Sequence, residues 1–495
     1  MRRFLRPVLI ATVLGGAPAL ALAHGFGQRY DLPVPLWLYL YGAAAAVALS
    51  FIVSSLFLGA SRAAGEYPRY NLLRNPVLRA VLLNPVLVGF LRLASVALLV
   101  LVIVAGLVGA QVPTINVTPT MVWIIWWIGL AFASILFGNV WAVLNPWLNI
   151  YRGLEALARR FAGVEYLDAG KSFPERLGIL PALLVFIAFV WIELVYRGAA
   201  VPYTLGLLAL AYTLFTLGGM LTFGPYAWLR HGEVFSIYFG ILARVAPVEI
   251  RVREAPETTD DLEAFSLAPN DRKEINLRLP AAGLLSARDS LPGETGFVLL
   301  MLASVTFDGL QNSAPWIDFF VLQKDALISD YAVFGTIGLA GALAVFAVVY
   351  LAAMAAARVL GSASVGLDRI AALFIYSLVP IAAAYNVAHY FTYFLISGQR
   401  MISLASDPLG MGWDLFGTAG YEMNAALFPP AFVWYLQVGL IIAGHVAAVA
   451  VAHIQALRSF GSPRKAMLSQ LPVLVLMVAY TVVSLWIISQ ETVNQ

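Results

Sequence analysis

About ten long apolar stretches recur along this chain, and they constrain its fold more than any other feature of the sequence. Each is long enough for a helix, rising ~1.5 Å per residue, to cross the roughly 30 Å hydrocarbon layer of a membrane. Because lipid offers no partner to backbone N–H and C=O groups, such stretches must be helical. The sequence predicts spans near 36–58, 87–110, 121–143, 178–196, 202–222, 297–321, 332–357, 370–396, 430–457 and 467–489.

The composition supports the same class. Of 495 residues, 61% are hydrophobic and 12% are charged, whereas soluble domains carry about 25% charged residues. We therefore predict an all-α polytopic transmembrane helix bundle whose main partner is the lipid bilayer. The net charge of +3 is too small to indicate a nucleic-acid partner. The absence of cysteine excludes disulfides and thiolate metal sites, so a metal would need His, carboxylate, Met, Tyr or terminal-amine ligands.

The N-terminus has the three zones of a secretory signal peptide. Three arginines within the first six residues precede a short apolar stretch that ends in Ala-Leu-Ala at 21–23. The stretch is short and interrupted by Gly and Pro, which favours a signal peptide over residues 1–23 rather than a spanning helix. Cleavage after Ala21 and an uncleaved anchor are the alternatives. Cleavage after Ala23 makes His24 the first residue of the mature chain.

Basic residues orient the predicted bundle. They gather in the loops after the first span, over 150–177 and over 247–295, whereas the loop 111–120 has no charge. The positive-inside rule then places both termini outside, at the bacterial inner membrane, with the mature N-terminus in the periplasm. We divide the chain into a signal peptide (1–23), five helices with a periplasmic tail (24–246), a cytoplasmic polar loop (247–296), and five helices with a periplasmic loop at 397–429 (297–495).

Ionisable residues within the spans are the candidate site residues. Such groups are expensive in a membrane and usually face the bundle interior. The sixth span carries Asp308 near mid-depth, the eighth carries His389, the ninth carries His445, and the fourth carries Glu193 near its outer end. Together with His24, they are expected to line one pocket beneath the 397–429 loop.

Within this pocket we predict a metal closest to His389. His24 or His445 would be its nearest imidazole partner, and Asp308 or Glu193 would be a carboxylate ligand or general base. His231 and His453 fall near the inner surface and outside the site. The plainer alternative is that the histidines join helices by hydrogen bonds and that Glu193 is a solvated rim carboxylate.

His24 has a specific chemistry if it begins the mature chain. Its α-amine and imidazole can close a chelate ring on a metal, and one more imidazole completes a three-nitrogen site that suits copper(II). This arrangement resembles the histidine brace of lytic polysaccharide monooxygenases and of the copper subunit of particulate methane monooxygenase. An ordinary periplasmic surface histidine is the alternative.

Four segments carry a resemblance to a known family. They read "AHGFGQRYDLPVPLWLYLYGAAAAVALSF", "FGNVWAVLNPW", "YNVAHYFTYFL" and "SDPLGMGWDLFGTAGY". In them the chain resembles the bacterial membrane proteins called fenitrothion hydrolases, over most of the mature chain. The resemblance implies a membrane-bound organophosphorus hydrolase with a second membrane subunit, acting on apolar arylthiophosphate triesters. It supplies no catalytic residues.

The chemistry of this predicted hydrolase has to come from the polar residues above. The chain has no G-x-S-x-G elbow, no HExxH helix and no phosphate-binding Gly loop. Water activated by copper or zinc is therefore the expected nucleophile, with the apolar substrate entering from the bilayer. Three alternatives stay open: a copper oxygenase, a metal or solute permease that uses the buried histidines as a path, and a non-catalytic scaffold subunit.

Overall fold

The structure is a computed structural model that describes residues 34–57, 67–253, 261–286 and 290–490. Helices dominate it, which confirms the predicted all-α polytopic bundle. The proposed signal peptide and His24 lie outside the described residues.

Nine helical segments among the described residues are long and apolar enough to cross a membrane. Their ends lie within a few residues of the predicted ones, with two exceptions: the second begins earlier, at Pro76, and the third, predicted to end at 143, ends at Phe137. They are α2 (Leu36–Phe57), α4 with α5 (Pro76–Leu82, Pro85–Val108), α6 with η2 and α7 (Val117–Pro119, Thr120–Gly129, Leu130–Phe137), η3 with α10 (Glu175–Leu177, Leu180–Leu194), α11 (Pro202–Phe223), α17 (Tyr331–Leu360), α18 with η5 and α19 (Leu367–Ile375, Tyr376–Leu378, Val379–Ser397), α21 (Pro430–Ser459) and α22 (Pro463–Ile488).

The sixth predicted span, 297–321, is not one helix. Helix α15 (Glu294–Gln311) is buried over most of its length, and a separate α16 (Ala314–Gln323) follows it. Ser313 between them is extended, and Pro315 favours a helix start here because it lacks the N–H that an interior position would need. The break places Asp308 one turn from the end of its helix instead of at mid-span.

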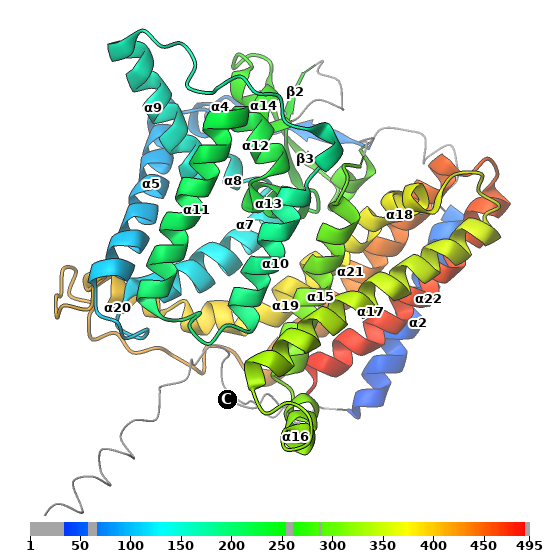
Figure 1. Cartoon of the computed structure of the whole chain (residues 1–495). Helices are drawn as coiled ribbons and strands as arrows, with labels where there is room; N and C mark the ends of the chain where they lie inside the picture. The colour runs from blue at the N-terminus through cyan, green and yellow to red at the C-terminus, as the bar shows by residue number, and fades with distance from the viewer. Residues whose placement is uncertain (1–33, 58–66, 254–260, 287–289, 491–495) are drawn as a thin grey trace, which may run out of the picture.

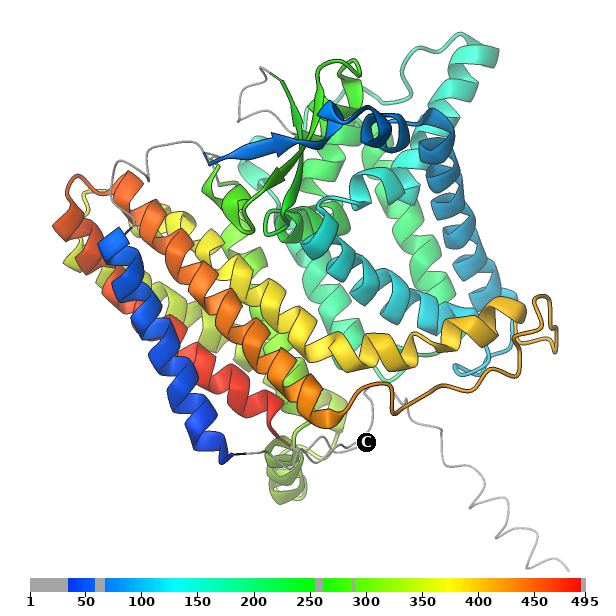
Figure 2. The same cartoon turned by 180° about the vertical axis from the view of Figure 1, so that it is seen from behind.

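The helices form two groups that meet along α15 and α19. In one group, α21 packs against α2, α19 and α22, while α17 packs against α15 and α22. The other contains α5, α7, α10 and α11 with the short α8 (Trp141–Leu144), α9 (Pro146–Ala162), α12 (Pro225–His231) and α13 (Val234–Ala243). Figures 1 and 2 show α19 leaving the first group and crossing toward η2 and α20 (Arg400–Ser406) of the second.

A small sheet lies at one end of the molecule, which we call the sheet face (top of Figure 1). Strands β1 (Arg69–Asn71), β3 (Lys273–Arg278) and β2 (Val248–Val252) pair antiparallel in that order. The sequence predicts only a polar loop over 247–296, but this segment supplies two of the strands and α14 (Asp261–Leu267).

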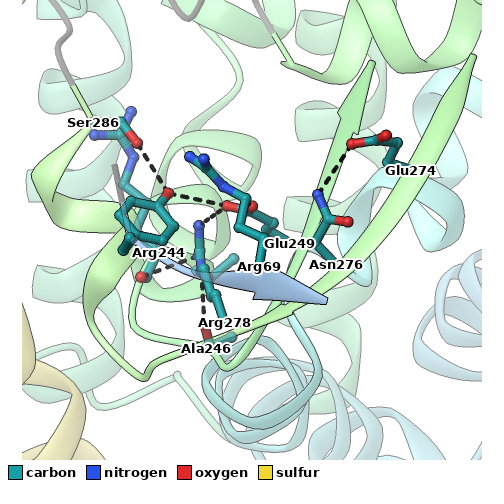
Figure 3. Close-up of polar contacts among 10 residues, drawn as sticks. Arg69, Arg244, Ala246, Glu249, Glu274, Asn276, Arg278 and Ser286 are labelled. Atoms are coloured by element: carbon teal, nitrogen blue, oxygen red, sulfur yellow. Dashed lines mark hydrogen bonds and ion pairs between the residues drawn. The ribbon is translucent and has the colours of Figure 1, made fainter. Parts of the chain in front are cut away.

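A partly buried ion-pair cluster fixes the sheet. Glu249 accepts hydrogen bonds from Arg69 Nε at 2.7 Å and Arg278 Nη1 at 2.5 Å, so one carboxylate joins all three strands (Figure 3). Arg278 also donates to the backbone carbonyl of Ala246 at 3.1 Å. These contacts tie the sheet to the end of α13.

The opposite end, which we call the loop face, carries the 397–429 loop and the end of α22 (bottom of Figure 1). After α20 (Arg400–Ser406), the carbonyls of Pro408 and Leu409 accept hydrogen bonds from Val117 N at 3.0 Å and Ala110 N at 2.8 Å. The loop therefore packs over the end of α5 and the start of α6.

Helices α5 and α11 contact each other at Gly106 and Gly206, and this contact leaves no room for a Cβ atom on Gly106. A Cβ on Gly106 would lie 2.7 Å from the Pro202 carbonyl oxygen and 2.8 Å from Gly206 Cα. We expect Gly106→Ala to destabilise the protein by about 1–3 kcal/mol in SDS-titration unfolding, because backbone cannot move aside as a side chain can. Gly42→Ala, which meets nothing within 4 Å, is the control. Equal stability of the two variants would contradict this packing.

Candidate functional site

Asp308 on α15 is a fully buried carboxylate that binds two side chains of α19. His389 Nε2 lies 2.9 Å from Asp308 Oδ2, and Tyr390 Oη donates to the same oxygen at 2.8 Å. The Asp308 side chain is 0% exposed and the His389 side chain is 15% exposed. The carboxylate is thus enclosed, while one part of the imidazole reaches accessible surface.

The end of α15 supports this carboxylate from the other side. Asn312 Nδ2 lies 3.3 Å from Asp308 Oδ1 and also donates to the Asp308 backbone carbonyl at 2.8 Å. Gln311 Nε2 lies 3.4 Å from Asp308 Oδ1. Asp308 and Asn312 share a helix face, as their spacing of four residues requires. Both carboxylate oxygens therefore have donors, which fixes the position of Asp308 relative to α19.

Glu193 lies beside this cluster, on α10. Its Oε1 accepts a 2.6 Å hydrogen bond from Trp127 Nε1, and it is close enough to Asp308 for the two charges to interact. Trp127 belongs to η2, a ten-residue π-helical stretch within its span. Such stretches are rare and often accompany functional sites. Trp127 also packs against Tyr238, with ring centroids 4.6 Å apart. The cluster thus extends across the seam between the two helix groups.

The cluster lies toward the loop face. Asp308 is three residues from the end of α15, and His389 is eight residues from the end of α19. Both helix ends lie on the side of the molecule that carries the 397–429 loop (Figures 1 and 2). This placement differs from the predicted mid-span depth of Asp308 because the helix ends at Gln311.

His445 does not join Asp308 and His389. Gln437 Nε2 donates to the Ala388 carbonyl at 2.9 Å, so His389 lies level with Gln437, eight residues before His445 on α21. Eight helical residues correspond to ~12 Å along the axis. The structure therefore separates two residues that the sequence analysis assigns to one pocket.

Two tyrosines connect these histidines. The Tyr385 ring lies parallel to His389 at 6.0 Å, the Tyr480 ring lies 6.4 Å from Tyr385, and the His445 ring lies 5.9 Å from Tyr480. His445 Nδ1 donates to the Ile441 carbonyl at 2.8 Å. Within the described part of the chain, His445 Nε2 and Tyr385 Oη are buried without a hydrogen-bond partner. We call this series the aromatic string.

The remaining described histidines have structural partners near the sheet face. His231 Nδ1 donates to the Gly178 carbonyl at 2.8 Å, and its ring stacks on Phe173 at 4.5 Å. His453 Nδ1 donates to Gln470 Oε1 at 2.9 Å. Neither residue contacts Asp308 or His389.

The described residues do not provide a complete set of ligands for the predicted copper or zinc centre. No group of three or more His, Asp or Glu side chains within residues 34–57, 67–253, 261–286 and 290–490 is placed to hold a metal. Asp308 and His389 supply two such groups, His445 is too distant, and His24 lies outside the described residues. The described donor set by itself does not fit a metal, so we derive no reaction step through one.

Sequence reasoning missed two members of the cluster. Tyr390 follows His389 directly, but the spacing of four residues that marks one helix face groups His389 with Tyr385 and Tyr393 instead. Trp127 lies in the apolar run "WIIWW", and such tryptophans are typical of a protein core or a membrane interface. A buried carboxylate needs several donors, and this requirement is the signal that points to Tyr390.

Comparison with protein-family models, with curated proteins and with solved structures finds no match to this chain.

Proposed function

We propose that this protein is a membrane-embedded hydrolase of apolar organophosphorus triesters in which His389 is the general base. The observation that carries this proposal is the contact of the enclosed Asp308 with the partly accessible His389. A carboxylate that holds one imidazole nitrogen fixes the orientation of the ring and stabilises its protonated form. Tyr390 and Asn312 keep that carboxylate in place.

The proposed reaction is attack of water on phosphorus. His389 Nδ1 takes a proton from the water as its oxygen bonds to phosphorus, and the aryloxide leaves with the electron pair of the broken P–O bond. Asp308 accepts a hydrogen bond from Nε2–H throughout and carries the charge opposite the imidazolium. The proton on His389 then passes to the aryloxide or to solvent, which restores the enzyme.

The substrate class in this proposal comes from the family resemblance. Arylthiophosphate triesters are apolar and dissolve in the bilayer, and the proposed base lies at a seam between two groups of apolar helices. The second membrane subunit and the periplasmic position of the loop face belong to the same proposal. The clustering of arginines at the sheet face supports that orientation. A copper or zinc centre with His24 also stays a proposal.

Isotope labelling distinguishes hydrolysis from oxidation. We expect purified protein in lipid nanodiscs to release the phenol from an arylthiophosphate without oxygen, and to place one oxygen from labelled water in the phosphorus product. Mass spectrometry of both products provides the measurement. A strict requirement for oxygen would reject the hydrolase in favour of the copper oxygenase, and cleavage unaffected by EDTA would remove the metal from the proposal.

A proton-coupled permease is the second candidate, and the aromatic string favours it. The string extends the Asp308–His389 contact to His445 at mid-depth through ring packing. Intramembrane chains of such residues can relay protons, and a path here would need water at Tyr385 Oη and His445 Nε2, which have no partner among the described residues. A permease requires His445 as well as His389, whereas the hydrolase requires only His389. Proton uptake into proteoliposomes that disappears in His445→Gln would favour the permease.

A further inference from the structure

Three cations meet near the sheet-face end of the second helix group. Arg92 on α5 and Arg152 on α9 are close enough for their charges to repel each other, and both interact with Lys273 on β3. Burial and these two arginines lower the pKa of Lys273. No carboxylate among the described residues forms an ion pair with Arg92 or Arg152. These two guanidinium groups therefore lack a carboxylate partner among the described residues.

Two nitrogen atoms of this cluster are buried and unsatisfied. Arg92 Nε and Arg152 Nη1 have no hydrogen-bond partner among the described residues. Arg152 Nη2 donates to Tyr226 Oη at 3.0 Å, so part of that guanidinium is held in position. Buried N–H groups without partners are rare because each loses its hydration without compensation. Guanidinium groups arranged this way suit a phosphate, which accepts several charge-assisted hydrogen bonds.

An apolar cavity of about 610 Å³ adjoins this cluster. Leu91 and Ser95, which flank Arg92 on α5, lie in its wall, as does Trp147, five residues before Arg152 on α9. The rest of the wall comes from η2, α7, α8, α10, α11 and α13 (Figure 1). The volume is within the usual range for small-molecule sites.

The wall of this cavity favours hydrocarbon. Three of its polar groups bond to protein acceptors: Trp123 Nε1 donates to the Ala199 carbonyl at 2.8 Å, Trp147 Nε1 to Thr213 Oγ1 at 2.9 Å, and Tyr212 Oη to Glu233 Oε1 at 2.7 Å. These rings thus offer apolar surface, and a chain without polar atoms fits such a wall.

The cavity reaches the outer surface between α10 and α11. Helix α11 packs against α5, and α10 packs against α13 and α15, so α10 and α11 have no extensive contact with each other. Ala188 on α10 and Ala211 on α11 belong to the wall and are exposed. Both helices are candidate membrane spans, so this side opening faces lipid.

We infer that this part of the protein is a binding site for an anionic phospholipid, with the phosphate at Arg92, Arg152 and Lys273 and one acyl chain in the cavity. The inference is independent of the proposed hydrolysis but rests on the proposed orientation, with the sheet face in the cytoplasm. A basic pocket between spans on the sheet face is where anionic headgroups bind when that face is cytoplasmic. The chain enters sideways from the bilayer while its phosphate stays at the end of the helices.

The experiment measures lipid binding to delipidated full-length protein in detergent. Native mass spectrometry follows titration with dioleoyl phosphatidylglycerol, dioleoyl phosphatidylcholine or inorganic phosphate. We expect phosphatidylglycerol to bind at least about tenfold more tightly than phosphatidylcholine, and Arg92→Gln with Arg152→Gln to remove this preference. Arg160→Gln removes an exposed charge from the same helix, α9, and is the control.

A second pair of variants tests the cavity. Ala209 lies in the cavity wall, so Ala209→Phe places a ring in the cavity and is expected to weaken phosphatidylglycerol binding at least fivefold. Ala97→Phe, on the outer side of α5, is the control and is expected to leave this binding unchanged. Equal binding of the two lipids, or an unchanged preference in the double arginine variant, would overturn the inference. Inorganic phosphate that binds as tightly as the lipid, with no effect of Ala209→Phe, would reject the acyl-chain site. Size-exclusion profiles confirm that each variant is folded.

Discussion

Replacing His389 by glutamine is expected to lower the rate of triester hydrolysis by about 10²- to 10⁴-fold, the usual contribution of a positioned general base. Glutamine keeps a donor for the Asp308 carboxylate but cannot take the proton of the attacking water. The measurement is phenol release from an arylthiophosphate by purified variants in nanodiscs. Because the 2.9 Å contact with Asp308 orients the ring, Asp308→Asn is expected to reduce the same rate while leaving substrate binding little changed.

His445→Gln provides the matched control for this prediction. His445 is likewise a histidine of a buried helix, but it bonds to the Ile441 carbonyl instead of a carboxylate and lies two tyrosines away along the aromatic string. We expect this variant to hydrolyse within about threefold of the unmodified protein. Equal losses in His389→Gln and His445→Gln would contradict a local base at His389 and support a relay along the string.

The spans were predictable because their cause is local in sequence. Stretches such as 202–222 are apolar throughout, and the structure begins and ends that helix at Pro202 and Phe223. In a bilayer the backbone has only itself to bond to, so length and hydropathy determine such a helix. The sixth span departs from its prediction because Pro315 interrupts an apolar run that averaging over a window treats as continuous.

The contact between Asp308 and His389 was only partly predictable from the sequence. A carboxylate and an imidazole in separate spans must each find a polar partner, and the sequence offers few. Which histidine Asp308 meets depends on the helix ends and on the tilt of α19. The helix ends and the tilt depend on packing, which the sequence does not reveal. The predicted position of His445 is therefore level with His389, whereas the structure places His445 further along α21. Tyr390 and Trp127 contribute through contacts across the seam, which no local pattern encodes.

The sheet was not predictable either, because its strands pair across a long stretch of sequence. Strand β1 lies before the second span, and its partner β3 follows some two hundred residues later. Strand β1 has only three residues, too few for a pattern. Strand β3 alternates polar and apolar residues from Glu274 to Arg278, but this short signal does not identify its partner. Glu249 and its two arginines read as ordinary loop charges until the fold places them together.

Glu233 is the buried carboxylate that holds the second helix group together. It is 0% exposed and caps the N-terminus of α13, where its oxygens accept hydrogen bonds from Phe235 N at 3.0 Å and Ser236 N at 2.7 Å. Tyr212 Oη donates to it at 2.7 Å, and Trp141 Nε1 and Asn145 Nδ2 each donate at 3.2 Å. All five partners are donors, so a group with two acceptor oxygens is required at this position.

We therefore expect Glu233→Ala to destabilise the protein by about 3–5 kcal/mol, because several buried donors lose their acceptor at once. Glu233→Gln is expected to cost nearly as much, since its amide nitrogen would face donors where an oxygen now accepts. Unfolding in SDS titrations provides the measurement. Glu155→Ala is the control: Glu155 forms only a 3.8 Å surface pair with Arg159, and its loss is expected to cost less than about 0.5 kcal/mol. A Glu233→Gln variant as stable as the unmodified protein would mean that the carboxylate charge is not needed, and that an amide can satisfy the same five donors.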